Sequence, residues 1–583
     1  MLLNVLSPGR NRMMFSAAAL LAFSSAAALA QVVVVPSTPQ VGSSNPATAD
    51  PLVPRPPTQP CIVPLLQEQA FADFSAKPIS YTPPAACPGP WAKVVFTADF
   101  TVTAGRQFDR TASFYLDHAN IYYGTTAEPR AKLSPSWHVE RDVTDLTAIF
   151  EAPQTGQADL GNFVGVSGGV TYNGIIYANA ALEFYPASWR APAPRTPDVV
   201  VPVEGSGGDA GTLNTTGDRI TQVLNLPRNV ERVVLDVIAQ SQSNDEQWFL
   251  CAPSDHAGNL QTCGNTAFRE TEVFIDGQPA GVAPVYPWIY TGGIDPYLWE
   301  PIPGVQTLNF KPYRVDLTPF AGVLADGGTH TVSVGVFNAN SYFLATANLL
   351  AYTDHGRQQV TGGLLSNTLS AEPAPVVTEN IAVDAKGTTY TGTASVTSNR
   401  RFAIRGYVDT SHGRVETTVE QRVDFANNQQ FNVGPATDVQ NAQQTSTVDS
   451  RVSTQDGFLV NTVEQHFSYP ITVDYAYLLK PDGSASQAVT VDQKYRVNES
   501  KNLNGFTYFK SKVSNVVNAA DTLNFTASGS YSPSDSKTTQ TYRATNSLGY
   551  CYSRTLKAAA KVLTSVTDGQ GCEREDEGGE GQR

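Results

Sequence analysis

The chain has 583 residues, which is too long for a single hydrophobic core and predicts several domains. Charged residues make up only 16%, and the 45 glycines and 39 prolines indicate a β-rich extracellular protein with many turns, which argues against a helical bundle or a disordered chain. The formal charge of −14 would repel a phosphate backbone, so we expect no nucleic acid partner. The composition therefore predicts an all-β fold.

The N-terminus predicts a secretory signal over residues 1–30. Two arginines precede an apolar run from Met13 to Leu29, and Ala28-Leu29-Ala30 supplies a small-x-small cleavage site. A membrane anchor is the alternative interpretation. No later stretch approaches the ~20 apolar residues of a transmembrane helix. We therefore expect a secreted or extracytoplasmic protein with no membrane partner once the signal is removed.

Breaks in composition divide the rest of the chain. Proline dominates residues 31–60, which predicts an exposed, extended spacer. Residues 61–195 and 198–358 contain short alternating runs separated by turn residues, and each predicts a β-sandwich. Residues 372–567 carry long Thr-, Ser-, Asn- and Gln-rich alternations that predict a further β-rich domain with at least one solvated face. The acidic, glycine-rich residues 568–583 indicate a disordered tail.

Hydrophobic periodicity predicts the individual elements. In the first unit we expect one short helix over Leu66–Phe74, followed by strands at Val94–Val102, Ser113–Leu116, Trp137–Val143 and Ile175–Tyr185. In the second unit the expected strands are Val230–Ala239, Thr271–Asp276, Tyr313–Leu317 and Thr329–Phe337. The two units echo each other in layout. Packed side by side, two such sandwiches would bring equivalent strand ends to a shared cleft.

Six cysteines form an even set, and pairing is the default in an exported protein. Proximity in sequence suggests three disulfides, although other connectivities are open: Cys61–Cys87, Cys251–Cys263 and Cys551–Cys572. None of the cysteines has the spacing of a zinc site, so we expect no metal there.

The segment Gly105–Arg110 places one acid between two arginines at the entrance to a strand. A carboxylate on a rigid strand end can be aimed at a substrate, whereas a structural salt bridge is the alternative. Because nearby cations favour the charged form, we expect Arg106 and Arg110 to keep Asp109 ionised.

The second unit offers two more acids, Glu246 and Glu270. Two carboxyls of unlike environment at one cleft suffice for hydrolysis, because one can activate water while the other holds a proton. A group of aromatic residues in the same unit could supply flat faces for a sugar, although ordinary packing is the alternative for each: Trp248, Trp288, Tyr290, Tyr297 and Trp299. No G-x-S-x-G, phosphate-binding glycine loop or H-E-x-x-H motif is present.

Four longer segments follow one another in a consistent order: Cys87–Val95 (CPGPWAKVV), Gly105–Arg110 (GRQFDR), Thr126–Arg130 (TAEPR) and Ile289–Trp299 (IYTGGIDPYLW). Through them the chain resembles the peptide N-glycosidase A family, the acid-type amidases that cleave N-glycans from asparagine. The resemblance implies adjacent jelly-roll-like sandwiches, N-glycosylated peptides or proteins as substrates, and no metal or organic cofactor.

The resemblance also implies roles for individual residues. Asp109 matches an acid that is essential in a bacterial relative, and Glu246, two residues before Trp248, is the nearest counterpart of a second, with Glu270 in reserve. A third acid of that relative has no clear match. The residues expected to bind substrate are Arg106, Arg110, Trp248, Tyr290 and Trp299.

A protein of a different class is the alternative. In a non-catalytic glycan-binding or adhesive protein, the aromatic residues would hold sugar and Asp109 would be structural. The Thr- and Ser-rich third region is compatible with that function.

Overall fold

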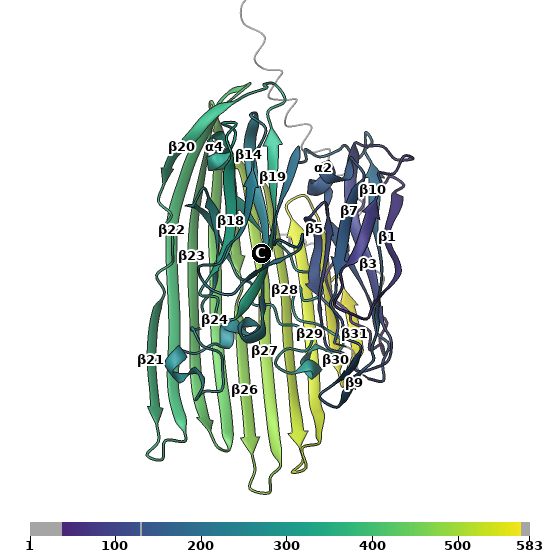
Figure 1. Cartoon of the computed structure of the whole chain (residues 1–583), viewed down its shortest axis with the longest axis vertical. Helices are drawn as coiled ribbons and strands as arrows, with labels where there is room; N and C mark the ends of the chain where they lie inside the picture. Colours follow the sequence, from purple (N-terminus) through teal and green to yellow (C-terminus); the bar gives the residue numbers. More distant parts are fainter. Residues whose placement is uncertain (1–37, 129–130, 573–583) are drawn as a thin grey trace, which may run out of the picture.

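Strands form nearly all of the regular structure in this computed structural model, which describes residues 38–128 and 131–572 (Figure 1). The all-β prediction is confirmed. The expected signal sequence, residues 1–30, lies outside the described residues. Within the described ranges, no helix is long and apolar enough to cross a membrane. The helical segments are single turns: η1 (Thr144–Leu146), α2 (Thr147–Phe150), η2 (Ser243–Asp245), η3 (Trp248–Leu250), α3 (Ser254–Ala257), η4 (Pro296–Trp299), η5 (Thr318–Phe320) and α4 (Ala321–Leu324).

The first unit consists of two facing antiparallel sheets and a small hairpin. One sheet has the order β1 (Cys61–Phe71), β10 (Ile176–Pro186), β3 (Trp91–Val102), β6 (Ser136–Asp142). The other has the order β2 (Lys77–Tyr81), β7 (Gln154–Asp159), β4 (Thr111–Leu116), β5 (Ala119–Thr125). The hairpin is β8 (Gly165–Ser167) and β9 (Val170–Tyr172). Phe96 of β3 packs on Phe114 of β4 with ring centroids 5.2 Å apart, so the core lies between the two sheets.

The predicted helix over Leu66–Phe74 is wrong, because β1 continues to Phe71 and the next three residues are not helical. Its pairing with β10 shifts register between Pro64 and Leu66 and again between Leu66 and Gln69. Bulges of this kind interrupt the alternation of side chains that identifies a strand in sequence. The resulting spacing of apolar residues resembles that of a helix.

The second unit repeats the two-sheet arrangement. One sheet runs β11 (Val199–Val203), β19 (Tyr342–Thr353), β14 (Val230–Gln242), β17 (Tyr313–Asp316), with β12 (Gly211–Leu213) beside β19. The other runs β13 (Ile220–Leu224), β18 (His330–Phe337), β15 (Glu270–Ile275), β16 (Gln278–Pro284). The strands predicted for both units are confirmed, with ends that differ by a few residues.

A large antiparallel sheet, 12-stranded within the described residues, follows the two sandwiches. Figure 1 shows it in green to yellow along the full height of the molecule, with the sandwiches beside it. It begins at Thr361, ahead of the domain start expected at residue 372. Its strands are β20 (Thr361–Asn367), β21 (Val376–Val383), β22 (Tyr390–Thr410), β23 (Gly413–Gly434), β24 (Thr437–Asp456), β25 (Leu459–Ser468), β26 (Ile471–Leu479), β27 (Ala485–Leu503), β28 (Phe506–Phe525), β29 (Tyr531–Asn546), β30 (Cys551–Ala559) and β31 (Val562–Asp568).

Polar side chains of this sheet are buried against the second sandwich. The side-chain amides of Asn427, Gln429 and Gln440 donate to the carbonyls of Phe249, Cys251 and Leu250 at 2.9, 3.0 and 2.7 Å. Buried carbonyls need such partners, because an unsatisfied polar group costs free energy. Exposed and buried residues alternate along β23, so the sheet has the expected solvated face, and on its other face these amides hold a loop of the second sandwich.

An exposed spacer was expected over residues 31–60; residues 31–37 lie outside the described structure, and the segment from residue 38 to residue 60 packs against the body of the protein in places. Ala49 is buried and its N–H donates to Oε1 of Gln540 at 2.7 Å. The guanidinium of Arg55 pairs with Glu140 and, at 3.0 Å, with Glu183 of the first sandwich. The segment thus joins the first sandwich to the large sheet.

The three predicted disulfides are confirmed: Cys61–Cys87, Cys251–Cys263 and Cys551–Cys572. The last of them anchors the beginning of the expected tail, residues 568–583, and residues 573–583 lie outside the described structure. Each bond closes a loop of fewer than 30 residues.

We expect Gly406→Ala in β22 to lower stability by about 1–3 kcal/mol, because overpacking at a tight contact costs this much. An added Cβ would overlap the carbonyl oxygen of Pro319 in η5, where the second sandwich meets the large sheet. The midpoint of thermal unfolding measures the effect. Gly363→Ala is the matched control, because its nearest contact would be Tyr407 at 3.9 Å. Equal midpoints for the two variants would contradict the close approach at Gly406.

Candidate functional site

Asp109 lies just before β4 and reaches across to the second sandwich. Its Oδ2 accepts a hydrogen bond of 2.9 Å from the N–H of Gly292, in the loop between β16 and η4. A second bond joins the two sandwiches nearby, since Oγ1 of Thr291 donates to the carbonyl of Thr126, just after β5, at 2.9 Å. The predicted acid is therefore held at the junction of the two sandwiches.

Glu128 brings a second carboxylate to this junction. A Cβ added to Gly292 would overlap a carboxylate oxygen of Glu128 and lie 3.1 Å from Oδ1 of Asp109. Both acids therefore converge on the Gly292 backbone, and only glycine leaves room for them.

Glu246 is the third acid of the cluster and follows η2 at the end of β14. The Glu246 backbone is fixed from both sides, because its N–H donates to Ser243 at 3.0 Å and its carbonyl accepts from Oγ of Ser241 at 3.1 Å. Burial raises the pKa of Glu246 to about 7, and the negative charges of Asp109 and Glu128 add to the increase. The three carboxyl groups thus interact electrostatically, although they come from three separate segments.

The surroundings of Asp109 differ from those expected of an acid held ionised by two arginines. Burial raises its pKa, while the Gly292 N–H and the charge of Arg110 offset part of the increase. Arg110 lies over the Phe108 ring and donates to Oε1 of Gln107 at 2.6 Å. Arg106 is exposed, with its guanidinium 5.7 Å from the ring centroid of Tyr172.

Glu270, the reserve candidate for the second acid, lies in different surroundings. It is buried at the start of β15, where it forms an ion pair with Arg400 of β22. Burial raises its pKa and Arg400 lowers it. The contact joins the second sandwich to the large sheet, so the structure gives Glu246, and not Glu270, a place beside Asp109.

Three aromatic residues expected to bind sugar are buried: Trp248, Tyr290 and Trp299 are 1%, 5% and 3% exposed. The Tyr290 hydroxyl donates to the carbonyl of Ser241, and Nε1 of Trp299 donates to that of Gly293 at 2.9 Å. These side chains support the loops that carry Glu246 and Gly292 and present no flat face to solvent. Phe108, which is exposed beside Asp109 and 5.3 Å from Tyr172, is an aromatic surface that the sequence did not reveal.

A groove of about 810 Å³ opens above Glu246 and Gly292. Three of its lining residues, Ser243, Gln261 and Ile294, have φ angles of +54°, +54° and +61°. Such values are rare for a β-branched residue and concentrate at functional sites. A groove containing perturbed carboxyl groups is the expected form of an active site for general acid–base hydrolysis.

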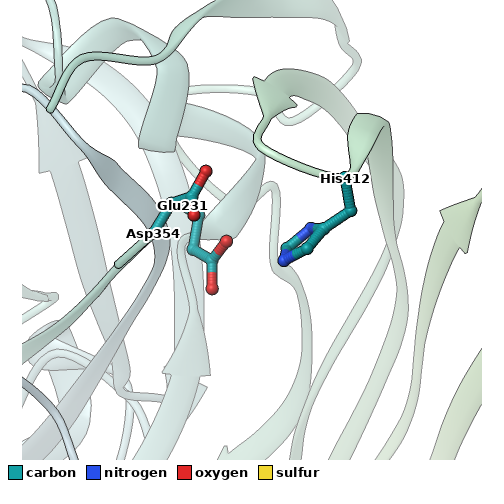
Figure 2. A group of neighbouring side chains, drawn as sticks. All are labelled: Glu231, Asp354 and His412. Carbon is teal, nitrogen blue, oxygen red and sulfur yellow. The ribbon is translucent and has the colours of Figure 1, made fainter. Parts of the chain in front are cut away.

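Glu231, Asp354 and His412 also gather, away from this groove (Figure 2). Asp354 accepts hydrogen bonds from N–H and Oγ of Ser411 at 2.5 and 2.7 Å, and Glu231 pairs with Arg195. These contacts explain the cluster as a link between the second sandwich and the β22–β23 turn, so we assign no metal to it.

Glu128 is the residue that sequence reasoning missed. It lies within the TAEPR segment, and β4 pairs with β5 as a hairpin in which Thr111 faces Thr125. Asp109 and Glu128 follow just outside these paired strand ends and must be neighbours. The hairpin register, once assigned, would have identified Glu128 as a neighbour of Asp109.

Known proteins match most of this chain. The family model described as peptide N-acetyl-β-D-glucosaminyl asparaginase amidase A matches residues 51–370, and a model of the PNGase A C-terminal domain matches residues 393–471. The curated peptide-N4-(N-acetyl-β-glucosaminyl)asparagine amidase A of Prunus dulcis is 26% identical over 551 residues, covering 89% of this chain and 91% of the relative.

Solved structures give more distant matches. PNGase F, a glycosylasparaginase from Flavobacterium meningosepticum, is 13% identical with a TM-score of 0.33, covering 51% of this chain and 96% of its own. PNGF-II is 11% identical with a TM-score of 0.33, covering 51% and 66%.

We expect Asp109→Asn to lower the pKa of Glu246 but to leave it above its usual range, because burial is the larger cause of the increase. Carbon-13 NMR of glutamate-labelled protein measures this pKa, and the signal missing from Glu246→Gln identifies it. Glu204, whose pKa of about 7 comes from burial and from groups other than Asp109, is the internal control. An unchanged Glu246 pKa would show that the two acids do not interact.

Proposed function

This chain belongs to the peptide N-acetyl-β-D-glucosaminyl asparaginase amidase A family, whose members are amidases, and we propose that it is secreted. We further propose that it uses Asp109 and Glu246 to hydrolyse the glycosylated asparagine side chain of glycopeptides or glycoproteins. The observation that carries the proposal is the hydrogen bond of Asp109 to Gly292 beside Glu246, at the edge of a groove. The scissile bond is the amide between asparagine and the first N-acetylglucosamine.

The two acids have different roles in the reaction because their surroundings differ. Burial raises the pKa of Asp109, and the Gly292 N–H and the nearby Arg110 offset part of that increase; we assign Asp109 as the base that takes a proton from water. Glu246, with a pKa of about 7, stays protonated at mildly acidic pH and donates to the leaving nitrogen. Glu128 adds negative charge that helps to keep this proton on Glu246.

The reaction balances with water alone. The water oxygen bonds to the side-chain carbonyl carbon of asparagine, the C–N bond breaks, and the nitrogen leaves with the sugar as a glycosylamine. The asparagine becomes aspartate. A second water then replaces the amine of the glycosylamine in solution, which releases ammonia and free glycan.

Secretion is supported by two features. The first 30 residues have the pattern of a signal sequence, and all six cysteines pair in disulfides. Disulfides persist in oxidising compartments, where glycoproteins are also found.

We expect the purified protein to convert an N-glycopeptide to its aspartate form and free glycan at mildly acidic pH, with an activity that falls by about 10²–10⁴-fold in Asp109→Asn. Mass spectrometry detects both products. Asp117→Asn is the matched control, because it lies at the far end of β4 with a φ of +46°, which asparagine adopts readily.

Three results would contradict this function. Release of shortened sugars alone would indicate a glycosidase. Full activity in Asp109→Asn would remove its catalytic role. Glycan retention without turnover, unaffected by the substitution, would favour the non-catalytic binding protein.

We expect kcat/KM to fall as the pH rises through about 7, because Glu246 then loses the proton that it must donate. Glu246→Gln cannot donate that proton, so activity should fall by about 10²–10⁴-fold and the residual rate should lose this alkaline decline. Glu204→Gln removes another carboxyl with a pKa of about 7 and should keep the decline. A decline near pH 7 that persists in Glu246→Gln would assign it to a different group.

A further inference from the structure

We propose that the large C-terminal sheet completes the substrate groove, and that Asp438 and Tyr475 bind the neutral, hydroxyl-rich sugars adjoining the scissile amide. The inference rests on the proposed function and extends it to a part of the chain outside the two sandwiches. The second sandwich and the large sheet both contribute residues that line the groove. Those of the second sandwich include Glu246, Thr262, Gly292 and Asn340, and those of the large sheet include Asp438 and Tyr475.

Strand pairing places the two sheet residues on one face. β24 and β26 lie side by side in the large sheet (Figure 1). In their pairing, Gln440 of β24 is opposite Tyr475 of β26. Residues two apart on a strand share a face, and directly paired residues point the same way. Asp438, Gln440 and Tyr475 therefore project together toward the groove, whereas Asp474 projects to the opposite face.

The chemistry of the lining selects the ligand. Within the described residues, the lining contains carboxylates, amides and hydroxyls but no lysine or arginine. A phosphorylated or sialylated group would meet only like charge, whereas sugar hydroxyls can donate to carboxylates and exchange hydrogen bonds with amides. The matching ligand is an uncharged oligosaccharide.

Asp438 and Tyr475 suit this ligand individually. In the described chain, neither carboxylate oxygen of Asp438 is engaged in a hydrogen bond, and burial is the cause that raises its pKa. Tyr475 is half-buried, and its hydroxyl donates to Oε1 of Gln487 at 3.3 Å. A fixed aromatic ring beside a hydrogen-bond acceptor can contact the apolar face of a sugar and one of its hydroxyls at the same time.

The sheet wall is rigidly connected to the acid it faces. Gln440, the neighbour of Tyr475, donates to the carbonyl of Leu250 at 2.7 Å, four residues after Glu246. The Cys251–Cys263 disulfide closes the loop that lines the same groove. A sugar held by β24 and β26 would therefore be held at a fixed position relative to Glu246, as positioning for catalysis requires.

The test measures binding without turnover, in full-length protein carrying Asp109→Asn. Isothermal titration calorimetry with a free neutral N-glycan core should give a Kd that rises about tenfold when Tyr475→Ala is added, and also rises with Asp438→Asn. Tyr475→Phe keeps the ring and should bind nearly as well as tyrosine, which separates loss of the contact from misfolding. Asp474→Asn, next in the chain but on the opposite face, is the matched control.

In the active protein, Tyr475→Ala should raise KM for the glycopeptide with little change in kcat, because its contact is made equally with substrate and transition state. An unchanged Kd in both Tyr475→Ala and Asp438→Asn would overturn the proposal even if amidase activity is confirmed. If the protein shows no amidase activity but glycan binding still depends on Tyr475, the proposed reaction fails and the binding site stands.

Discussion

Buried side-chain hydrogen bonds from the large sheet to two loops are the constraint on which the site depends. Amides of β23 and β24 satisfy the carbonyls that follow Glu246, and Oγ1 of Thr538 donates to Leu298, beyond Gly292, at 2.6 Å. Without these donors the carbonyls of Phe249, Cys251 and Leu298 would be buried and unpaired, or the loops would turn toward solvent. The position of the carboxyl groups is therefore a property of three packed units and not of the two sandwiches alone.

Sequence patterns predicted the structure correctly where a pattern has a single physical cause. Alternation identified the sandwich strands, and proximity identified the disulfides. They failed where two causes give one pattern. The bulges of β1 resemble helical spacing, and Gln440 appears polar whether its amide meets water or a buried carbonyl. Resolving these cases requires the partner, which is distant in sequence.

Prediction of the candidate site from sequence was limited in the same way. Asp109 and Glu246 were candidates from the residues around them, and the family resemblance gave them roles, but spacing alone could not show that the charge of Asp109 raises the pKa of Glu246. Trp248 was expected to bind sugar as one of a group of aromatic residues, yet its indole packs in the core against Phe425. An aromatic residue near a catalytic acid has the same sequence signature whether it faces the groove or supports it from behind.

Acidic conditions favour both the site and its support for one physical reason. The pKa of Glu246 is raised to about 7, chiefly by burial and then by the charge of Asp109. The pKa of Asp521 is also raised to about 7, by burial and then by Asp295. Asp295 caps the η4 turn, which follows Gly292 in the chain. A carboxyl with a higher pKa in the folded state takes up a proton on folding, so its contribution to stability is largest below its unfolded pKa and declines until the folded pKa is reached. Between about pH 4 and 7, the contribution of these groups to the free energy of unfolding therefore falls as the pH rises. The protonated state that stabilises the loops is also the state in which Glu246 has a proton to donate.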